Sequence, residues 1–214
     1  MRNNLLDHTF GPFRALIMSK RALHTALALG LTLPLLAGCG GAALIGGVAA
    51  GAAIVHERRA TRTLLEDEYL EHLAIRQLTD NPDIAEHSRI TVTSYNHLVL
   101  LTGQAEARSF SDRFARLVAR LPKVRRVINE VTIEPTVSLA REGRDTLITS
   151  RVKLALTKIN IPGFDTTRVK VITEAGTVFL MGLVYPREGQ AAAEKARYVP
   201  DVTKVVKVFE YIEL

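Results

Sequence analysis

The single cysteine, Cys39, has the most distinctive chemistry in this sequence. It ends the stretch Leu36-Ala37-Gly38-Cys39, and the apolar run of residues 22–36 lies upstream, after Lys20 and Arg21. A cationic start, an apolar middle and small residues at a cleavage point are typical of an export signal. A lone cysteine in an exported chain has no partner for a disulfide bond, which indicates another role for its thiol.

A cysteine at such a cleavage point resembles the bacterial lipobox. The resemblance implies cleavage before Cys39, followed by acylation of its thiol and of the new amino terminus. Gly40, in place of aspartate, resembles the sorting signal for the outer membrane. The alternatives are a buried cysteine after a transmembrane helix and an uncleaved anchor. Residues 41–55 alone are apolar but shorter than the ~20 residues of a membrane span.

Residues 1–38 are therefore expected to be a signal peptide, and residues 39–60 a lipidated cysteine with a Gly/Ala-rich tether. Met18 is an alternative initiator, because residues 1–17 contain Asp7, Gly11 and Pro12 and look unlike the start of a signal.

Without residues 1–38 the chain has 24 cations and 21 anions, a net charge of +3. That excess is too mild to indicate nucleic acid as a partner.

No group of residues in the sequence predicts catalysis, so we expect neither an enzyme nor a cofactor or metal site. The histidines after Cys39 lack metal-ligand spacing, and His97, beside an expected turn, should be solvated. The carboxylates Glu66-Asp67-Glu68 are expected at a helix start, where the helix dipole favours negative charge. Gly103 and Gly182 end expected strands and should serve bends.

From about residue 61 the chain repeats itself with an offset of 79 residues, as between Arg89 and Arg168. Each copy contains two expected strands joined by a turn, over residues 89–93, 96–103, 168–172 and 175–182. Tyr95-Asn96 and Ala175-Gly176 supply the turn chemistry. An amphipathic helix precedes each hairpin, and a second helix and a closing strand follow it. This order predicts an α+β fold with helices on one face of each sheet.

These repeats resemble the BON domain, present twice. The resemblance rests on the hairpin ending in glycine, the helix after it, and the closing strand with Val127-Ile128-Asn129 or Val205-Val206-Lys207. It implies two tandem domains, at residues 61–135 and 144–214, joined by a linker at residues 136–143. Each would be a small three-stranded mixed sheet with helices packed on one face.

With the lipobox upstream, the chain resembles the dual-BON outer-membrane lipoproteins of Gram-negative bacteria. This resemblance implies binding to phospholipid and a role in keeping the outer membrane intact.

The opening helix of the second copy offers a candidate surface for anionic phospholipid. On a helical wheel one stripe within about 80° should face the sheet, formed by Ile148, Val152, Leu156 and Ile159. A flank outside this stripe contains Leu147, Arg151, Leu154 and Lys158. Leucines that enter the interface while cations meet phosphates suit an anionic membrane. The alternative is that the two leucines pack under the linker or on the other copy.

A second basic strip lies near the end of the second helix of the first copy. It consists of Arg113, Arg116, Arg120, Lys123, Arg125 and Arg126. The preferred interpretation is a solvated helix face, with positive charge favoured at the C-terminus of the helix.

Taken together, the lipobox, the repeat and the flank predict a lipid-anchored outer-membrane protein that faces the periplasm, binds anionic phospholipid and helps maintain the membrane. The rivals are an adaptor that binds an envelope protein or peptidoglycan, and an envelope enzyme.

Overall fold

The computed structural model describes residues 58–135 and 139–213, and these residues belong to one compact unit. The predictions made for the signal peptide, for Cys39 and for most of the tether lie outside the described residues. The first part of the expected linker, residues 136–138, also lies outside them, whereas residues 139–143 belong to helix α6 (Leu139–Leu156) and not to a linker.

The first copy begins with helix α3 (Thr61–Thr79) and a short helix α4 (Pro82–Glu86) that was not predicted from the sequence. The following elements are β1 (Ser88–Tyr95), β2 (Leu98–Ala105), α5 (Arg108–Val118), β3 (Arg126–Asn129) and β4 (Thr132–Ile133). Strands β1 and β2 are antiparallel, whereas β3 and β4 both pair with β2 in parallel. The closing strand expected over residues 124–133 is therefore interrupted.

The second copy repeats this order without a counterpart of α4 and with one closing strand instead of two. Its elements are α6 (Leu139–Leu156), the 3-10 turn η2 (Thr166–Arg168), β5 (Val169–Glu174), β6 (Thr177–Val184), α7 (Pro186–Arg197) and β7 (Lys204–Tyr211). Strand β6 pairs with β5 antiparallel and with β7 in parallel, so the sheet order is β5-β6-β7. Two mixed sheets built on the same helix, strand, strand, helix, strand plan confirm the predicted repeat and the α+β fold, but the first sheet has four strands and not the predicted three.

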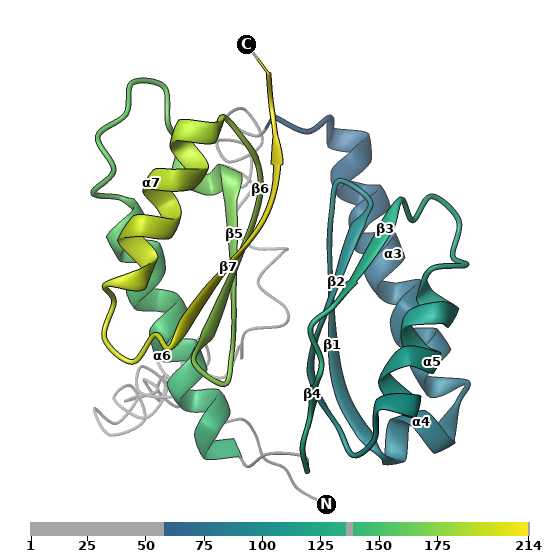
Figure 1. The fold of residues 1–214 in the computed structure, drawn as a ribbon. Coiled ribbons are helices and arrows are strands. Elements are labelled where there is room, and N and C mark those ends of the chain that lie inside the picture. The colour runs from purple at the N-terminus through teal and green to yellow at the C-terminus, as the bar shows by residue number, and fades with distance from the viewer. Residues whose placement is uncertain (1–57, 136–138, 214) are drawn as a thin grey trace, which may run out of the picture. The chain divides into compact units, whose positions relative to one another are not determined.

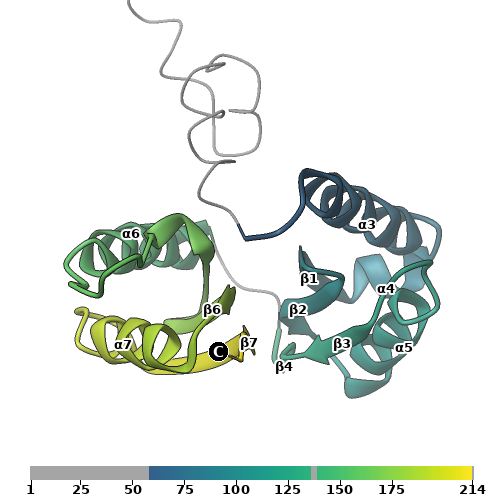
Figure 2. The same cartoon turned by 90° about the horizontal axis from the view of Figure 1, so that it is seen from above.

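In each copy the helices cover one face of the sheet, as expected (Figures 1 and 2). The first copy packs α3, α4 and α5 on its sheet around a core that contains Ala74, Ile84, Val99, Leu101, Phe114 and Val118. The second packs α6 and α7 around a core that contains Ile148, Val152, Leu156, Val178, Leu180 and Ala196. Apolar side chains spaced along each helix produce these two cores.

A third core lies between the two copies. It contains Tyr95, Leu98 and Leu100 from the first sheet and Phe179, Met181 and Val208 from the second. Strand β2 is consequently buried at all eight positions. Strands buried on both faces read as continuous apolar runs, as in Leu98–Leu101. The sheet faces without helices thus stabilise each other.

Both hairpins turn through two residues with positive φ. These are Asn96 and His97 in the first copy, at 52° and 63°, and Ala175 and Gly176 in the second, at 50° and 77°. Two residues with φ > 0 make the turn whose twist matches a hairpin. The second turn lies where the sequence predicted it, whereas the first lies one residue later than the predicted Tyr95-Asn96.

Gly103 and Gly182 do not end strands, so the bends predicted for them are wrong. They lie inside β2 and β6, opposite Ile90 and Val169. A Cβ atom added at Gly103 would lie 2.0 Å from the carbonyl oxygen of Arg89. One added at Gly182 would lie 2.4 Å from that of Arg168. At both sites the neighbouring strand approaches too closely for any side chain.

Candidate membrane-contact site

Helix α6 separates its apolar residues into a buried stripe and an exposed flank. Ile148, Val152 and Leu156 are buried against the sheet, which confirms the predicted stripe. Leu147 and Leu154 are 49% and 63% exposed, so neither packs as a core residue. The structure thus places both predicted leucines on the surface, on a helix whose core side is already filled.

The two predicted cations differ in their surroundings. A nitrogen of Arg151 lies 2.8 Å from a carboxylate oxygen of Asp201, so this guanidinium already has a charged partner. Lys158 is exposed in the turn after α6 and forms no ion pair with any residue in the described ranges. Lys158 is therefore the freer of the two to meet an anionic group.

Beside this flank lies an open groove of ≈ 720 Å³. Leu154 lines it together with Lys153, Lys170 and Arg59, above a floor of Leu156, Val169 and Val171. The sequence did not indicate Arg59, Lys153 and Lys170 as neighbours, because they come from three separate segments and meet only in the fold. Cationic and apolar side chains therefore share one concave surface next to the predicted flank.

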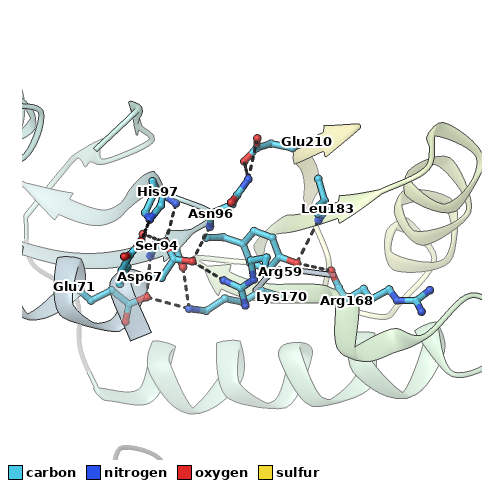
Figure 3. Close-up of polar contacts among 12 residues, drawn as sticks. Arg59, Asp67, Glu71, Ser94, Asn96, His97, Arg168, Lys170, Leu183 and Glu210 are labelled. Carbon is cyan, nitrogen blue, oxygen red and sulfur yellow. Dashed lines mark hydrogen bonds and ion pairs between the residues drawn. The ribbon is translucent and has the colours of Figure 1, made fainter. Parts of the chain in front are cut away.

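A buried carboxylate positions each hairpin beside its opening helix. Asp67 accepts hydrogen bonds from the backbone N–H groups of Asn96 and His97 and from the Ser94 hydroxyl, all at 2.7 Å (Figure 3). In the second copy Asp145 accepts the N–H groups of Ala175 and Gly176, both at 2.9 Å. The two residues have the same role: each satisfies the donors of a turn that has no strand partner of its own.

Two predictions for this region are wrong. Residues 66–68 lie in the second turn of α3, which begins at Thr61, so they are not a cluster at the helix start. His97 is half-buried, with Nε2 3.0 Å from a carboxylate oxygen of Glu66, and is not simply solvated. Lys123 and Arg62 also bond Glu66 and lower its pKa to about 2, so this group stays ionised at neutral pH.

Half of the basic strip of the first copy is engaged in ion pairs. Arg113 pairs with Asp83, Lys123 with Glu66, and Arg125 with Glu210 of the second copy. Within the described parts of the chain, Arg116, Arg120 and Arg126 have no ion-pair partner. The strip thus divides equally between surface ion pairs and exposed cations without such a partner.

A membrane-spanning helix and a metal site are both absent from the part of the chain that the structure describes. No helix there has the length and hydropathy of a membrane span. No group of three or more His, Cys, Asp or Glu side chains in the same residues could hold a metal ion. The exposed flank of α6 and the adjoining groove therefore remain the strongest candidate for a contact surface.

Comparison with known proteins places this geometry in a family. Residues 66–135 and 144–213 each match the BON domain. The outer membrane lipoprotein DolP of Haemophilus influenzae is 37% identical over 189 residues, which cover 88% of this chain and 95% of that protein. A 21 kDa hemolysin of Actinobacillus pleuropneumoniae is 37% identical over 155 residues, 72% of this chain and 79% of that protein.

Among solved structures, the C-terminal domain of CdsD, a structural protein of the type III secretion system of Chlamydia trachomatis, is similar over 69% of this chain and 67% of its own. Its sequence identity is 12% and its TM-score 0.27.

The relation to DolP extends over nearly the whole of both proteins and confirms the predicted location, a lipid anchor in the outer membrane. Neither of these relatives is named as an enzyme, and the absence of catalysis stays a prediction. Two matched domains, with two α+β units in the predicted order, establish that the chain belongs to the BON domain family, with the domain present twice.

Proposed function

We propose that this outer-membrane lipoprotein faces the periplasm, contacts anionic phospholipid through the flank of α6, and helps maintain the membrane. The proposal rests on one observation: helix α6 has exposed leucines in addition to the apolar stripe that it buries against the sheet. Leu147 and Leu154 are exposed although Ile148, Val152 and Leu156 already supply its core contacts. Exposed leucines next to cations suit the interface of an anionic membrane.

The leucines should supply most of the binding energy. Burial of two leucine side chains in an interface contributes up to ~3–6 kcal/mol, and less where the side chains stay partly wet. Each cation near an anionic surface adds ~1 kcal/mol. Because Arg151 is paired with Asp201, its share should be smaller than that of Lys158. Lys153, which also lines the groove, extends the positive surface, whereas Lys170 is paired with Glu71 at 3.0 Å.

Changing both Leu147 and Leu154 to serine should weaken binding to anionic vesicles by about tenfold or more, because over a kilocalorie of interface burial is lost. The assay is co-sedimentation of the chain from residue 40 onward, which lacks the acyl group. Leu65→Ser is the matched control, since Leu65 is equally exposed at 63% but lies on α3. A fall in melting temperature of many degrees in the double variant would show that these leucines are core residues.

Changing Arg151 and Lys158 to glutamine should remove the preference for anionic over zwitterionic vesicles, mainly at low salt, because salt screens exposed charges. Arg116 and Arg120 provide a matched control pair of exposed cations on the first copy. If the control pair lowers binding and the α6 pair does not, the contact surface lies on the basic strip of the first copy.

Cys39→Ala should abolish lipid anchoring, because the thiol is the acyl acceptor in the proposed modification. The protein should then leave the membrane fraction, and mass spectrometry of the wild-type protein should show an acylated Cys39 at the amino terminus. A wild-type protein with an unmodified Cys39 still joined to Gly38 would contradict acylation at this residue and favour an uncleaved anchor.

A further inference from the structure

Arg58, the first described residue after the tether, contacts the second copy. Its two terminal nitrogens lie 2.7 and 3.0 Å from the two carboxylate oxygens of Glu188, and one of them donates to the carbonyl of Leu183 at 3.1 Å. Its guanidinium also lies 4.5 Å from the centre of the Tyr185 ring. A two-pronged contact of this kind fixes the arginine in orientation as well as in position.

The carboxylate that receives Arg58 is itself fixed at the start of α7. Glu188 is buried and accepts the backbone N–H of Tyr185 at 2.8 Å. Burial opposes ionisation of Glu188, but the bonds from Arg58 and Tyr185 outweigh it and lower the pKa of the carboxyl group. Arg58 thus ends in a buried, charged site and not on the surface.

Arg59, the next residue, contacts the first copy. Its side chain is nearly buried, with a nitrogen 2.6 Å from Oδ2 of Asp67 and its guanidinium 3.7 Å from the centre of the Tyr95 ring. The Tyr95 hydroxyl reaches the second copy, where it accepts the Leu183 N–H at 3.3 Å and lies 3.4 Å from the Arg168 carbonyl (Figure 3). Two consecutive arginines therefore bind the two copies at one junction.

We infer that Arg58 and Arg59 form a strap that fastens the root of the tether to both copies and so fixes where the lipid-anchored segment leaves the domain pair. Arg59 lines the same groove as Leu154. The described chain therefore begins, at Arg58 and Arg59, at the groove beside the exposed flank of α6. In this respect the inference rests on the proposed function: the two arginines are positioning residues that present α6 to the membrane holding the anchor.

The strap differs from ordinary surface ion pairs. Exposed pairs on one helix, such as Arg62 with Glu66, are worth little and join nothing distant. The partners of the strap are nearly buried, and Arg58 and Glu188 are 130 residues apart in sequence. Buried charged partners cannot be left unpaired without a large cost, so the strap should stay closed in the native protein.

The test uses the full lipidated protein in vesicles that contain phosphatidylglycerol. The variant changes both Arg58 and Arg59 to lysine, which keeps the charges but removes the two-pronged contact. A fluorophore is attached through Ser150→Cys, an exposed position on α6 outside the leucine flank, while acylation protects Cys39. Arg62→Lys is the matched control, since Arg62 is three residues further along the chain and 83% exposed.

Two readouts separate fastening from positioning. Hydrogen exchange of the Asn96, His97 and Tyr185 amides, which donate to Asp67 and Glu188, should rise by about tenfold in the strap variant. Quenching of the fluorophore by lipid-borne quenchers should be largely lost in the same variant. The Arg62→Lys control should match the wild type in both readouts.

Wild-type exchange and quenching in the strap variant would overturn the inference. If the strap variant shows faster amide exchange but the same fluorophore quenching as the wild type, the two arginines join the copies without positioning α6 at the membrane, which would contradict their positioning role. If the wild-type fluorophore is not quenched at all while exchange still rises in the variant, the fastening is supported and the proposed membrane contact of α6 fails.

Discussion

Asp67→Ala is expected to lower the free energy of unfolding by about 3–5 kcal/mol, the cost typical of removing one partner of a buried charged contact. Asp67 is buried and accepts bonds from Ser94, from the amides of Asn96 and His97, and from Arg59. The turn amides have no other acceptor in the hairpin, and each buried donor left unpaired costs ~1–3 kcal/mol. The strap and the first hairpin should weaken together.

Chemical denaturation of a short series of variants provides the measurement. Asp145→Ala removes the acceptor of two turn amides in the second copy, without a charged partner, and should cost less than Asp67→Ala. Glu68→Ala is the control, because Glu68 is the exposed neighbour of Asp67 and its loss should change the stability by no more than ~0.5 kcal/mol. Equal effects of Asp67→Ala and Glu68→Ala would show that the buried carboxylate does not hold the hairpin.

Gly103→Ala is expected to destabilise the first copy by about 2–5 kcal/mol, through a steric clash and backbone strain together. The new Cβ would lie 2.0 Å from the carbonyl oxygen of Arg89, a backbone atom that is held in the β1–β2 ladder. The φ angle of Gly103 is +107°, in a region that residues with a side chain rarely adopt. Strand β2 is central and fully buried, so the sheet cannot relax outward.

Gly143→Ala is the matched control for this substitution. Gly143 lies within α6, and an added Cβ would meet nothing within 4 Å. In a helix interior the change to alanine should stabilise the protein by ~0.5–1 kcal/mol. Thermal unfolding should therefore shift in opposite directions for the two variants. A Gly103→Ala protein as stable as the wild type would mean that β1 and β2 are further apart than described.

The spacing of apolar residues was sufficient to predict most of each copy. The stripe of Ile148, Val152 and Leu156 identified the core face of α6, and the two similar hairpin sequences revealed the repeat. Local periodicity fixes such features, because a helix or hairpin positions its side chains by its own geometry. The same reasoning left Leu147 and Leu154 outside the core, where the structure has them.

The contact between the two sheets was not predicted, because alternation within a strand describes only one face at a time. The runs Leu98–Leu101 and Val178–Met181 are apolar at every position, and this continuity was the available sign of two-sided burial. It does not say which surface covers the second face. In the structure that surface is the sheet of the other copy, through Tyr95, Leu98, Leu100, Phe179, Met181 and Val208.

The polar network was also missed, since its members come from distant segments. Asp67 appeared to be one of three acidic residues on a helix, and Arg58 and Arg59 appeared to be the end of the tether. A comparison of the two copies could have indicated Asp67, because Asp145 lies at the corresponding place in the second opening helix. No such signal exists for Arg58 or Arg59, which precede the first copy and have no counterpart in the repeat.

The most direct test of the account is vesicle binding by the chain from residue 40 onward, which carries both copies but no acyl group. Vesicles of phosphatidylglycerol mixed with phosphatidylcholine are compared with vesicles of phosphatidylcholine alone, at low and at moderate salt. We predict co-sedimentation with the anionic vesicles, a clear preference over the zwitterionic ones, and loss of this preference as salt screens the exposed cations. Failure of the acyl-free chain to bind anionic vesicles at low salt would contradict direct recognition of phospholipid.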